Sequence, residues 1–218
     1  MGGPAGGLVG EGEAVMLLFP TANSAIHEIS KQSPGHYGFL VQPGVRGVRT
    51  CIQQGLPWAA DNGAFAKFRE EAYLRMLENH LPWKDTCLFA VAPDVLANHR
   101  KTLELWTNWH PCVRSMDYPV AFVAQDGCDK VPWKELDVLF IGGTNEFKDR
   151  LAVPIIREAQ EQGVWTHVGR VNGRRRVRYC LELGVQSIDG TGFAIEPDGR
   201  LREYHRWIAE WEAQRRLF

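Results

Sequence analysis

Eight short hydrophobic runs recur along the chain, and most of them are apolar at nearly every position rather than at every second one. Continuous apolar runs of this length are typical of parallel strands that are covered on both faces. We therefore expect β-strands over residues 14–20, 37–43, 56–61, 87–94, 118–126, 137–143, 165–171 and 185–190.

Amphipathic segments separate most of these runs, with apolar residues spaced three or four positions apart. This spacing predicts helices over residues 70–81, 96–109, 147–163, 174–184 and 201–216. Eight strands that alternate with helices predict an α/β fold, namely a compact (β/α)8 TIM barrel. A doubly wound open sheet is the alternative, because the number of strands does not prove closure. We expect one barrel domain over residues 14–218 and a flexible glycine-rich leader over residues 1–13.

The composition narrows the class of protein. Of the 218 residues, 44% are hydrophobic and 23% are charged, as in ordinary globular proteins. The net charge of -1 excludes a generally basic coat, so a nucleic acid would have to meet a local patch. The five cysteines are scattered, without a CxxC pair, so we expect reduced thiols, no metal and a cytoplasmic location. No apolar run reaches the ~18 residues of a membrane span, so we expect no membrane partner.

Polar residues and glycines stand where the predicted strands end. In a barrel these positions share the C-terminal face, where barrel enzymes place their active sites. A single aspartate at a strand end is commonly structural, but several carboxylates, an amide and a glycine pair together suit acid–base chemistry on a hydrogen-bonding ligand. The strand ends concerned are Asp61, Pro93-Asp94, Gln125-Asp126-Gly127, Gly142-Gly143-Thr144, Gly169-Arg170 and Asp189-Gly190-Thr191.

Arginines crowd the start of the predicted helix over residues 174–184. Their positive charge opposes the helix dipole there, so local helix stability does not explain them. One interpretation is a phosphate-binding patch after the seventh strand; the other is a solvated face with acidic neighbours. The residues are Arg174, Arg175, Arg176 and Arg178, together with Arg170 at the strand end. We expect His167, inside the seventh strand, to be a packed core histidine rather than a ligand.

The order of these motifs resembles the tRNA-guanine transglycosylase superfamily. The similarity is greatest to the short phage and bacterial relatives that insert 7-deazaguanine derivatives into DNA. It extends from about residue 56 to residue 193. The motifs that carry it are "DNGAF", "APDVLAN", "FVAQDG", "FIGGT", "HVGRV" and "SIDGT".

The resemblance implies a base-exchanging transferase that replaces guanine in a polynucleotide. Asp189 matches the family's nucleophile, and Asp61 matches its general acid and base. It also implies a set of base-binding residues. These are Phe65, Asp94, Gln125, Gly142, Gly143 and Val168. From the residues alone, Phe65 could equally be a core residue or a face for a planar ligand.

The sequence departs from the family in two respects. Asn62, Ala64 and Ala66 replace the family's serine, glycine and glutamine, and no cysteine follows Asp189. We therefore expect a barrel without the zinc subdomain, no cofactor, and DNA ahead of tRNA as the polymer, in the host cytoplasm if the protein is phage-encoded. The second partner would be a free purine-like base such as preQ0, and a homodimer or a helper protein stays open.

Two other functions use the same residues. With water as the acceptor, the carboxylate pair would make a hydrolytic nucleosidase or DNA glycosylase. A barrel that only binds a nucleobase would need neither carboxylate for chemistry.

Overall fold

The computed structural model describes residues 16–20, 26, 28–30, 35–44, 49–64 and 67–215. The predicted leader over residues 1–13 and the predicted base-binding residue Phe65 lie outside this range. Each of the eight predicted strands is present, shorter than its apolar run. They are β1 (Leu17–Pro20), β2 (Phe39–Val41), β3 (Trp58–Ala60), β4 (Cys87–Val91), β5 (Val120–Ala124), β6 (Val138–Ile141), β7 (Trp165–Val168) and β8 (Ser187–Gly190).

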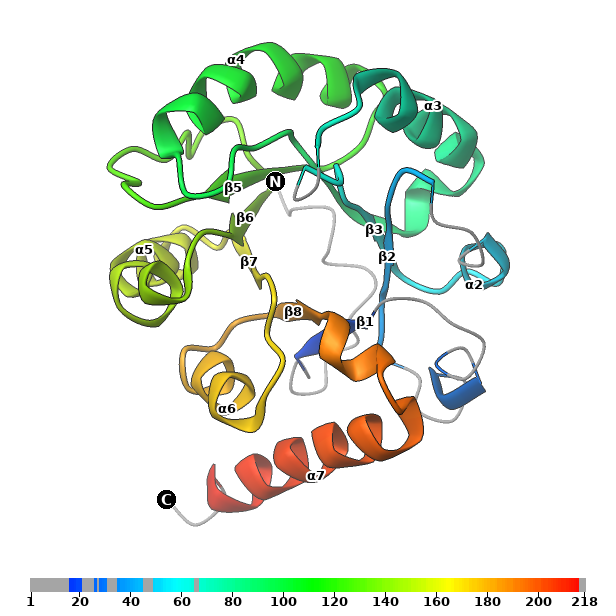
Figure 1. Ribbon diagram of the computed structural model, residues 1–218, viewed down its shortest axis with the longest axis vertical. Coiled ribbons are helices and arrows are strands. Elements are labelled where there is room, and N and C mark those ends of the chain that lie inside the picture. The colour runs from blue at the N-terminus through cyan, green and yellow to red at the C-terminus, as the bar shows by residue number, and fades with distance from the viewer. Residues whose placement is uncertain are drawn as a thin grey trace.

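The strands form one parallel sheet that closes on itself. Its order is β1-β8-β7-β6-β5-β4-β3-β2, so every neighbour is also a neighbour in sequence except at the β1–β8 pair. The remaining gap is bridged because Leu18 pairs with Tyr37, and Gly38 N–H donates to the Leu18 carbonyl at 3.0 Å. The fold is therefore the predicted compact α/β TIM barrel rather than an open sheet, and Figure 1 shows the strands inside a ring of helices.

The helices follow the predicted order, except that one predicted helix is divided and a short helix over residues 49–53 was not predicted. The predicted helix over residues 147–163 is divided at Ala152, because Pro154 lies in the first turn of a new helix, where its missing N–H is tolerated. A π-helical turn, Phe147–Leu151, precedes it. The α-helices are α2 (Arg49–Gln53), α3 (Glu70–His80), α4 (His99–Ser115), α5 (Val153–Glu161), α6 (Arg174–Glu182) and α7 (Pro197–Arg215). Two 3-10 segments lie over Leu81–Thr86 and Thr191–Ala194.

Strand side chains alternate between the inside of the barrel and the layer under the helices. Phe19, Ala59 and Val123 belong to the buried cluster inside the barrel, whereas Leu18 and Ile188 pack in the larger cluster against the helices. Because the period along a strand is two residues, the residue two positions beyond an inward one also points inward. Because of this alternation, the polar residues that follow the strand ends in the inward register point toward the barrel axis. In the part of the chain that is described, no helix is long and apolar enough to cross a membrane.

Candidate active site

A cavity of about 410 Å³ lies at the carboxyl ends of the strands. Its volume falls in the range of small-molecule sites, roughly 300–1,000 Å³. Apolar side chains from the barrel interior line part of it, among them Phe19, Leu40 and Phe140. Its polar lining contains five of the predicted site residues that carry a side chain. These are Asp61, Asp94, Gln125, Arg170 and Asp189.

Asp61 follows β3 and is held by two hydrogen bonds to neutral groups. Gln42 Nε2 donates to Oδ2 at 2.6 Å, and the Gly63 N–H donates to Oδ1 at 3.0 Å. Burial raises the pKa of Asp61 to about 6, with the negative charges of Asp189 and Asp94 adding to the rise against these two hydrogen bonds. A carboxyl group with such a pKa can both give and take a proton near neutral pH.

Asp94 follows β4 and is fixed by two amide side chains. Asn62 Nδ2 donates to Oδ1 at 2.8 Å, and Gln125 Nε2 donates to Oδ2 at 2.6 Å. Gln125 is in turn held by the Ala97 N–H, which donates to its Oε1 at 2.9 Å. Burial raises the pKa of Asp94, while the two amide hydrogen bonds oppose the rise. The sequence departure at Asn62 therefore has a structural role: it orients Asp94.

The glycine pair after β6 lines the cavity where a side chain would not fit. A Cβ atom at Gly142 would lie 2.7 Å from Gln125 Nε2, and one at Gly143 would lie 2.5 Å from Asp126 Oδ2. Gly143 also has a φ of +73°, which favours glycine. The Gly142 N–H donates to the Ala124 carbonyl at 3.0 Å, so this amide belongs to the sheet rather than to the cavity.

Asp189 lies in β8 and receives one hydrogen bond on each oxygen. The Arg170 backbone N–H donates to Oδ1 at 2.9 Å, and His167 Nε2 lies 3.0 Å from Oδ2. Its side chain is 13% exposed and lines the same cavity as Asp61, with β1 and β2 between their strands. His167 is buried in the barrel core as predicted, but the prediction missed its contact with Asp189. The two-residue period of β7 and β8 places both side chains inward, so strand periodicity in the sequence could have predicted this contact.

Val168 is not brought into the cavity. Its side chain lies in the hydrophobic layer between the sheet and the helices, because the neighbouring His167 takes the inward position. Gly169 lines the cavity instead. Sequence reasoning also missed Gln42, although it stands two positions after the inward Leu40 and could have been found by the same periodicity.

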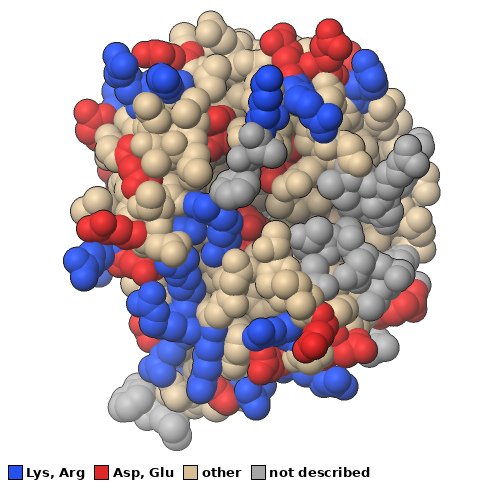
Figure 2. All heavy atoms as spheres, in the orientation of Figure 1, with Lys and Arg blue, Asp and Glu red and all other residues tan. Residues whose placement is uncertain are grey.

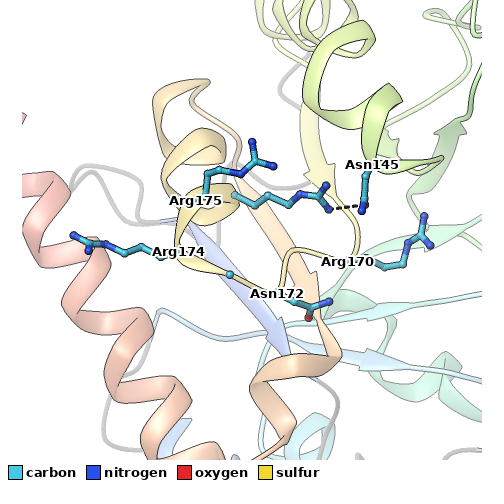
Figure 3. A pocket seen from close by; sticks show the side chains of 7 residues that line it. Asn145, Arg170, Asn172, Arg174 and Arg175 are labelled. Atoms are coloured by element: carbon cyan, nitrogen blue, oxygen red, sulfur yellow. Dashed lines mark hydrogen bonds between the residues drawn. The ribbon is translucent and has the colours of Figure 1, made fainter.

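The predicted arginine patch forms a second, open depression of about 600 Å³ beside the cavity. Figure 3 shows Arg170, Asn172, Arg174 and Arg175 around the N-terminal end of α6, with Asn145 opposite. In Figure 2 basic side chains extend from near the middle of the face toward the lower left, where α6 lies in Figure 1. Arg170 and Asn172 line both the depression and the cavity, so the two are continuous.

Every arginine of α6 has an acidic partner. Arg174 pairs with Glu210 at 2.6 Å, and Arg175 pairs with Asp149 at 2.9 Å. Arg176 shares Asp149 and donates to Asn145 at 2.7 Å. Arg178 pairs along the helix with Glu182 at 2.9 Å and does not line the depression. Each interpretation of the patch therefore agrees with part of the structure. The arginines have acidic neighbours, and three of those on α6 also line a concave surface.

Among residues 16–215, as far as they are described, no group of three or more histidine, cysteine or acidic side chains is arranged to hold a metal ion. No family model matches the chain, and no curated protein sequence matches it.

Two solved structures are similar to that of this chain. A mutant of methylaspartate ammonia lyase from Clostridium tetanomorphum aligns with a TM-score of 0.51 and 10% identity. The alignment covers 95% of this chain but 61% of that one, so the chain spans less than two thirds of that enzyme. The HpcH/HpaI aldolase from Desulfitobacterium hafniense DCB-2 aligns with a TM-score of 0.48 and 13% identity, over 90% of this chain and 94% of its own. The similarity to the lyase shows the fold alone.

Proposed function

We propose that this protein is a base-exchanging N-glycosyl transferase that replaces guanine in a polynucleotide, DNA ahead of tRNA, with a 7-deazaguanine-type base. One observation carries the proposal. Asp61 and Asp189 line a single cavity but have different surroundings, so that one carboxyl group is suited to proton transfer and the other to covalent attack. Enzymes commonly give two carboxyl groups the separate roles of acid and nucleophile by placing them in different surroundings.

In the first half of the reaction, a carboxylate oxygen of Asp189 attacks the anomeric carbon of the target nucleotide. The bond between that carbon and the guanine nitrogen breaks, and its electron pair stays with the base. Asp61 gives its proton to the same nitrogen, so that neutral guanine leaves and a glycosyl ester remains on Asp189.

In the second half, the incoming base attacks the anomeric carbon and displaces Asp189 as a carboxylate. Asp61 takes the proton that the ring nitrogen of the incoming base loses, which restores the starting protonation state. Two displacements at one carbon retain its configuration, as in retaining glycosidases. The pKa of about 6 serves both halves, because the carboxyl group changes its protonation state easily near neutral pH.

Asp94 and Gln125 supply the recognition of the base. Both oxygens of Asp94 accept from protein amides, so the carboxylate offers its remaining lone pairs only to hydrogen-bond donors. A guanine-type edge carries a ring N–H and an amino group, which are such donors. Phe140, Val91 and Val123 line the apolar side of the cavity and suit a flat ring.

The arginine depression is the proposed contact for the flanking phosphates. Its continuity with the cavity through Arg170 and Asn172 would let a nucleotide turn out of the strand while its neighbours stay on the basic surface. Extrusion from a duplex costs a few kcal/mol, so we expect single-stranded or mismatched DNA to react faster.

The test is base exchange by the purified full-length chain. Single-stranded DNA, duplex DNA and tRNA are each incubated with isotope-labelled guanine or with preQ0, digested to nucleosides and analysed by mass spectrometry. We expect the label in deoxyguanosine or a 7-deazaguanine nucleoside in DNA, and none with Asp189→Asn.

Each alternative has a distinct outcome in this experiment. Release of free guanine without incorporation would identify the hydrolytic nucleosidase or glycosylase. Binding of a free base that Asp189→Asn leaves unchanged, with neither exchange nor release, would identify the non-catalytic barrel. Either result would overturn the transferase.

A further inference from the structure

His167 lies at the centre of a hydrogen-bonded series inside the barrel. Trp165 Nε1 donates to Ser187 Oγ at 2.9 Å, and Ser187 Oγ lies 2.9 Å from His167 Nδ1. His167 Nε2 lies 3.0 Å from Asp189 Oδ2. The side chains of His167 and Ser187 are fully buried, so their hydrogen bonds are satisfied within the protein.

The direction of this series follows from the donors at its start. The indole N–H of Trp165 can only donate, so Ser187 Oγ accepts there. The single hydroxyl hydrogen of Ser187 then needs an acceptor, and His167 Nδ1 is the one within reach in the described contacts. A nitrogen that accepts carries no proton, so the ring proton of His167 stands on Nε2. Nε2–H therefore donates to Asp189.

Three aromatic rings surround the imidazole and fix its plane. The ring centroids of Phe140, Phe89 and Phe19 lie 4.5 Å, 5.2 Å and 5.7 Å from that of His167. These contacts exclude water and leave the imidazole little room to turn. The donor on Nε2 therefore has a fixed direction, which is what orientation of a reacting group requires.

On these grounds we propose that His167, as a neutral imidazole protonated on Nε2, is the positioning residue that holds the carboxylate of Asp189 in its reactive orientation. The proposal rests on the proposed function in that Asp189 is the nucleophile. The Arg170 N–H holds the other oxygen, so one donor within β7 and one just after it fix the carboxylate plane. Gly169 lies between them and leaves room for the carboxylate, because a Cβ there would lie 2.8 Å from the Phe140 ring and 3.2 Å from Asp189 Oδ2.

The same triple of serine, histidine and aspartate types could be mistaken for a hydrolase triad. Ser187 is fully buried and receives the Trp165 N–H, so a substrate has no access to its oxygen. The order of roles is reversed here: the serine sets the tautomer, and the aspartate faces the cavity.

The first arm of the test needs no substrate. Protein labelled with ¹⁵N-histidine is studied by long-range ¹H–¹⁵N correlation NMR near pH 7.5, and the signals of His167 are identified as those that disappear in His167→Gln. We expect one ring with the proton on Nε2 and an unprotonated Nδ1. A ring with the proton on Nδ1, or an imidazolium, would overturn the proposal.

The second arm measures base exchange under saturating polynucleotide. His167→Phe should lower kcat by about 10- to 100-fold, the equivalent of one hydrogen bond to a charged group. The KM of the free base should stay within about twofold, because Asp94 and Gln125 set it. The matched control is Thr166→Val. Thr166 lies next to His167 in β7, and the change removes the hydrogen bond of its buried hydroxyl group to Gln186 without affecting a contact of Asp189. It should keep the wild-type kcat, and a folded His167→Phe with wild-type kcat would refute the inference.

A pair of amide variants guards against poor folding of the phenylalanine variant. The amide nitrogen of glutamine reaches about where Nε2 stands, whereas that of asparagine reaches about where Nδ1 stands. We expect His167→Gln to exchange base at least about 10-fold faster than His167→Asn, again one hydrogen bond to a charged group. Equal rates would overturn the positioning role. If the wild-type protein exchanges no base at all, the proposed function fails, and the NMR arm alone decides the state of His167.

Discussion

The cavity at the strand ends and the arginine depression share two lining residues yet hold their charges in opposite ways. In the cavity, Asp61 and Asp94 are held by amide and backbone N–H groups, and burial raises the pKa of both. On α6, every arginine faces a carboxylate at the surface, and the arginines around Asp149 lower its pKa even though burial opposes this.

This difference suits the cavity to proton transfer and the depression to the binding of phosphate, the two roles proposed for them. Burial among neutral hydrogen-bond donors raises the pKa of a carboxyl group, and the value of about 6 at Asp61 lets this group work as an acid near neutral pH. A surface arginine with an acidic partner has its field partly cancelled, and each such pair contributes only about 0–1 kcal/mol to stability. A phosphate can replace the carboxylate partner, so the depression would bind polyanions weakly and reversibly.

The largest expected effect concerns Asp189, the proposed nucleophile. Asp189→Asn removes the carboxylate that forms the glycosyl ester in the proposed mechanism, so base exchange should fall by at least about 1,000-fold. Intact-protein mass spectrometry of the denatured reaction mixture should show a covalent nucleic-acid adduct with the wild-type chain and none with the variant. Substantial exchange by a correctly folded Asp189→Asn protein would contradict the covalent route.

The second largest effect is on the free energy of unfolding when Asp61 is replaced. Its folded pKa of about 6 lies above the ordinary value of 3.8, so the folded state binds the extra proton and the free energy of unfolding falls as the pH rises between these values. Asp61→Asn removes this loss and should stabilise the protein at pH 7.5 by up to about 3 kcal/mol, with little gain below pH 4.

Urea unfolding at the two pH values measures this gain. The control is Asp85→Asn at an exposed position, where we expect the same small change at both. The Asp61→Asn protein should at the same time lose base exchange. If its gain in free energy of unfolding over wild type is smaller at pH 7.5 than at pH 4, the pKa of Asp61 is not raised.

The third effect concerns recognition of the base. Asp94→Asn replaces an acceptor-only group by an amide that also donates, so the KM of the free base should rise by about 10- to 100-fold. Steady-state exchange with varied base measures it. Asp129→Asn, in the exposed loop after β5, is the control and should leave the KM unchanged. An unchanged KM in Asp94→Asn would remove Asp94 from the base site.

The smallest effect concerns the arginine depression. The double variant Arg174→Ala and Arg175→Ala should raise the Kd for single-stranded DNA about 3- to 10-fold and flatten its salt dependence by less than the full ~0.7 per contact, since both arginines are already paired. Fluorescence anisotropy at several salt concentrations measures both. Arg178→Ala is the matched control, because Arg178 lies on the same helix outside the depression. An equal loss with Arg178→Ala would make the effect one of net charge alone.

The barrel was predictable because its signal is local and repeated. Eight apolar runs separated by amphipathic segments appear in the sequence, and Gly163 and Gly184 adopt the left-handed conformation expected after a helix, with φ of +68° and +67°. The short helix α2 has too few residues to show a period. The division at Ala152 followed from Pro154, whose missing N–H marks a helix start.

The site was partly predictable for the same reason. Residues placed at strand ends converge in any closed barrel, so Asp61, Asp94 and Asp189 could be brought together without coordinates. Val168 was assigned to the base site although His167, its neighbour, holds the inward position of β7. A strand has two faces, and a motif match does not say which residue takes the inner one.

The sequence by itself determined the barrel, the face on which its polar residues meet, and the pair of acids that this face contains, because these depend on periods and positions along single elements. Only the tertiary structure decided the state of each group. The raised pKa of Asp61, the acidic partners of the arginines and the bond from His167 to Asp189 all depend on residues far apart in the chain, 22 positions for His167 and Asp189, 36 for Arg174 and Glu210, and 128 for Asp61 and Asp189. Burial and hydrogen bonding between such residues arise only when the sheet closes.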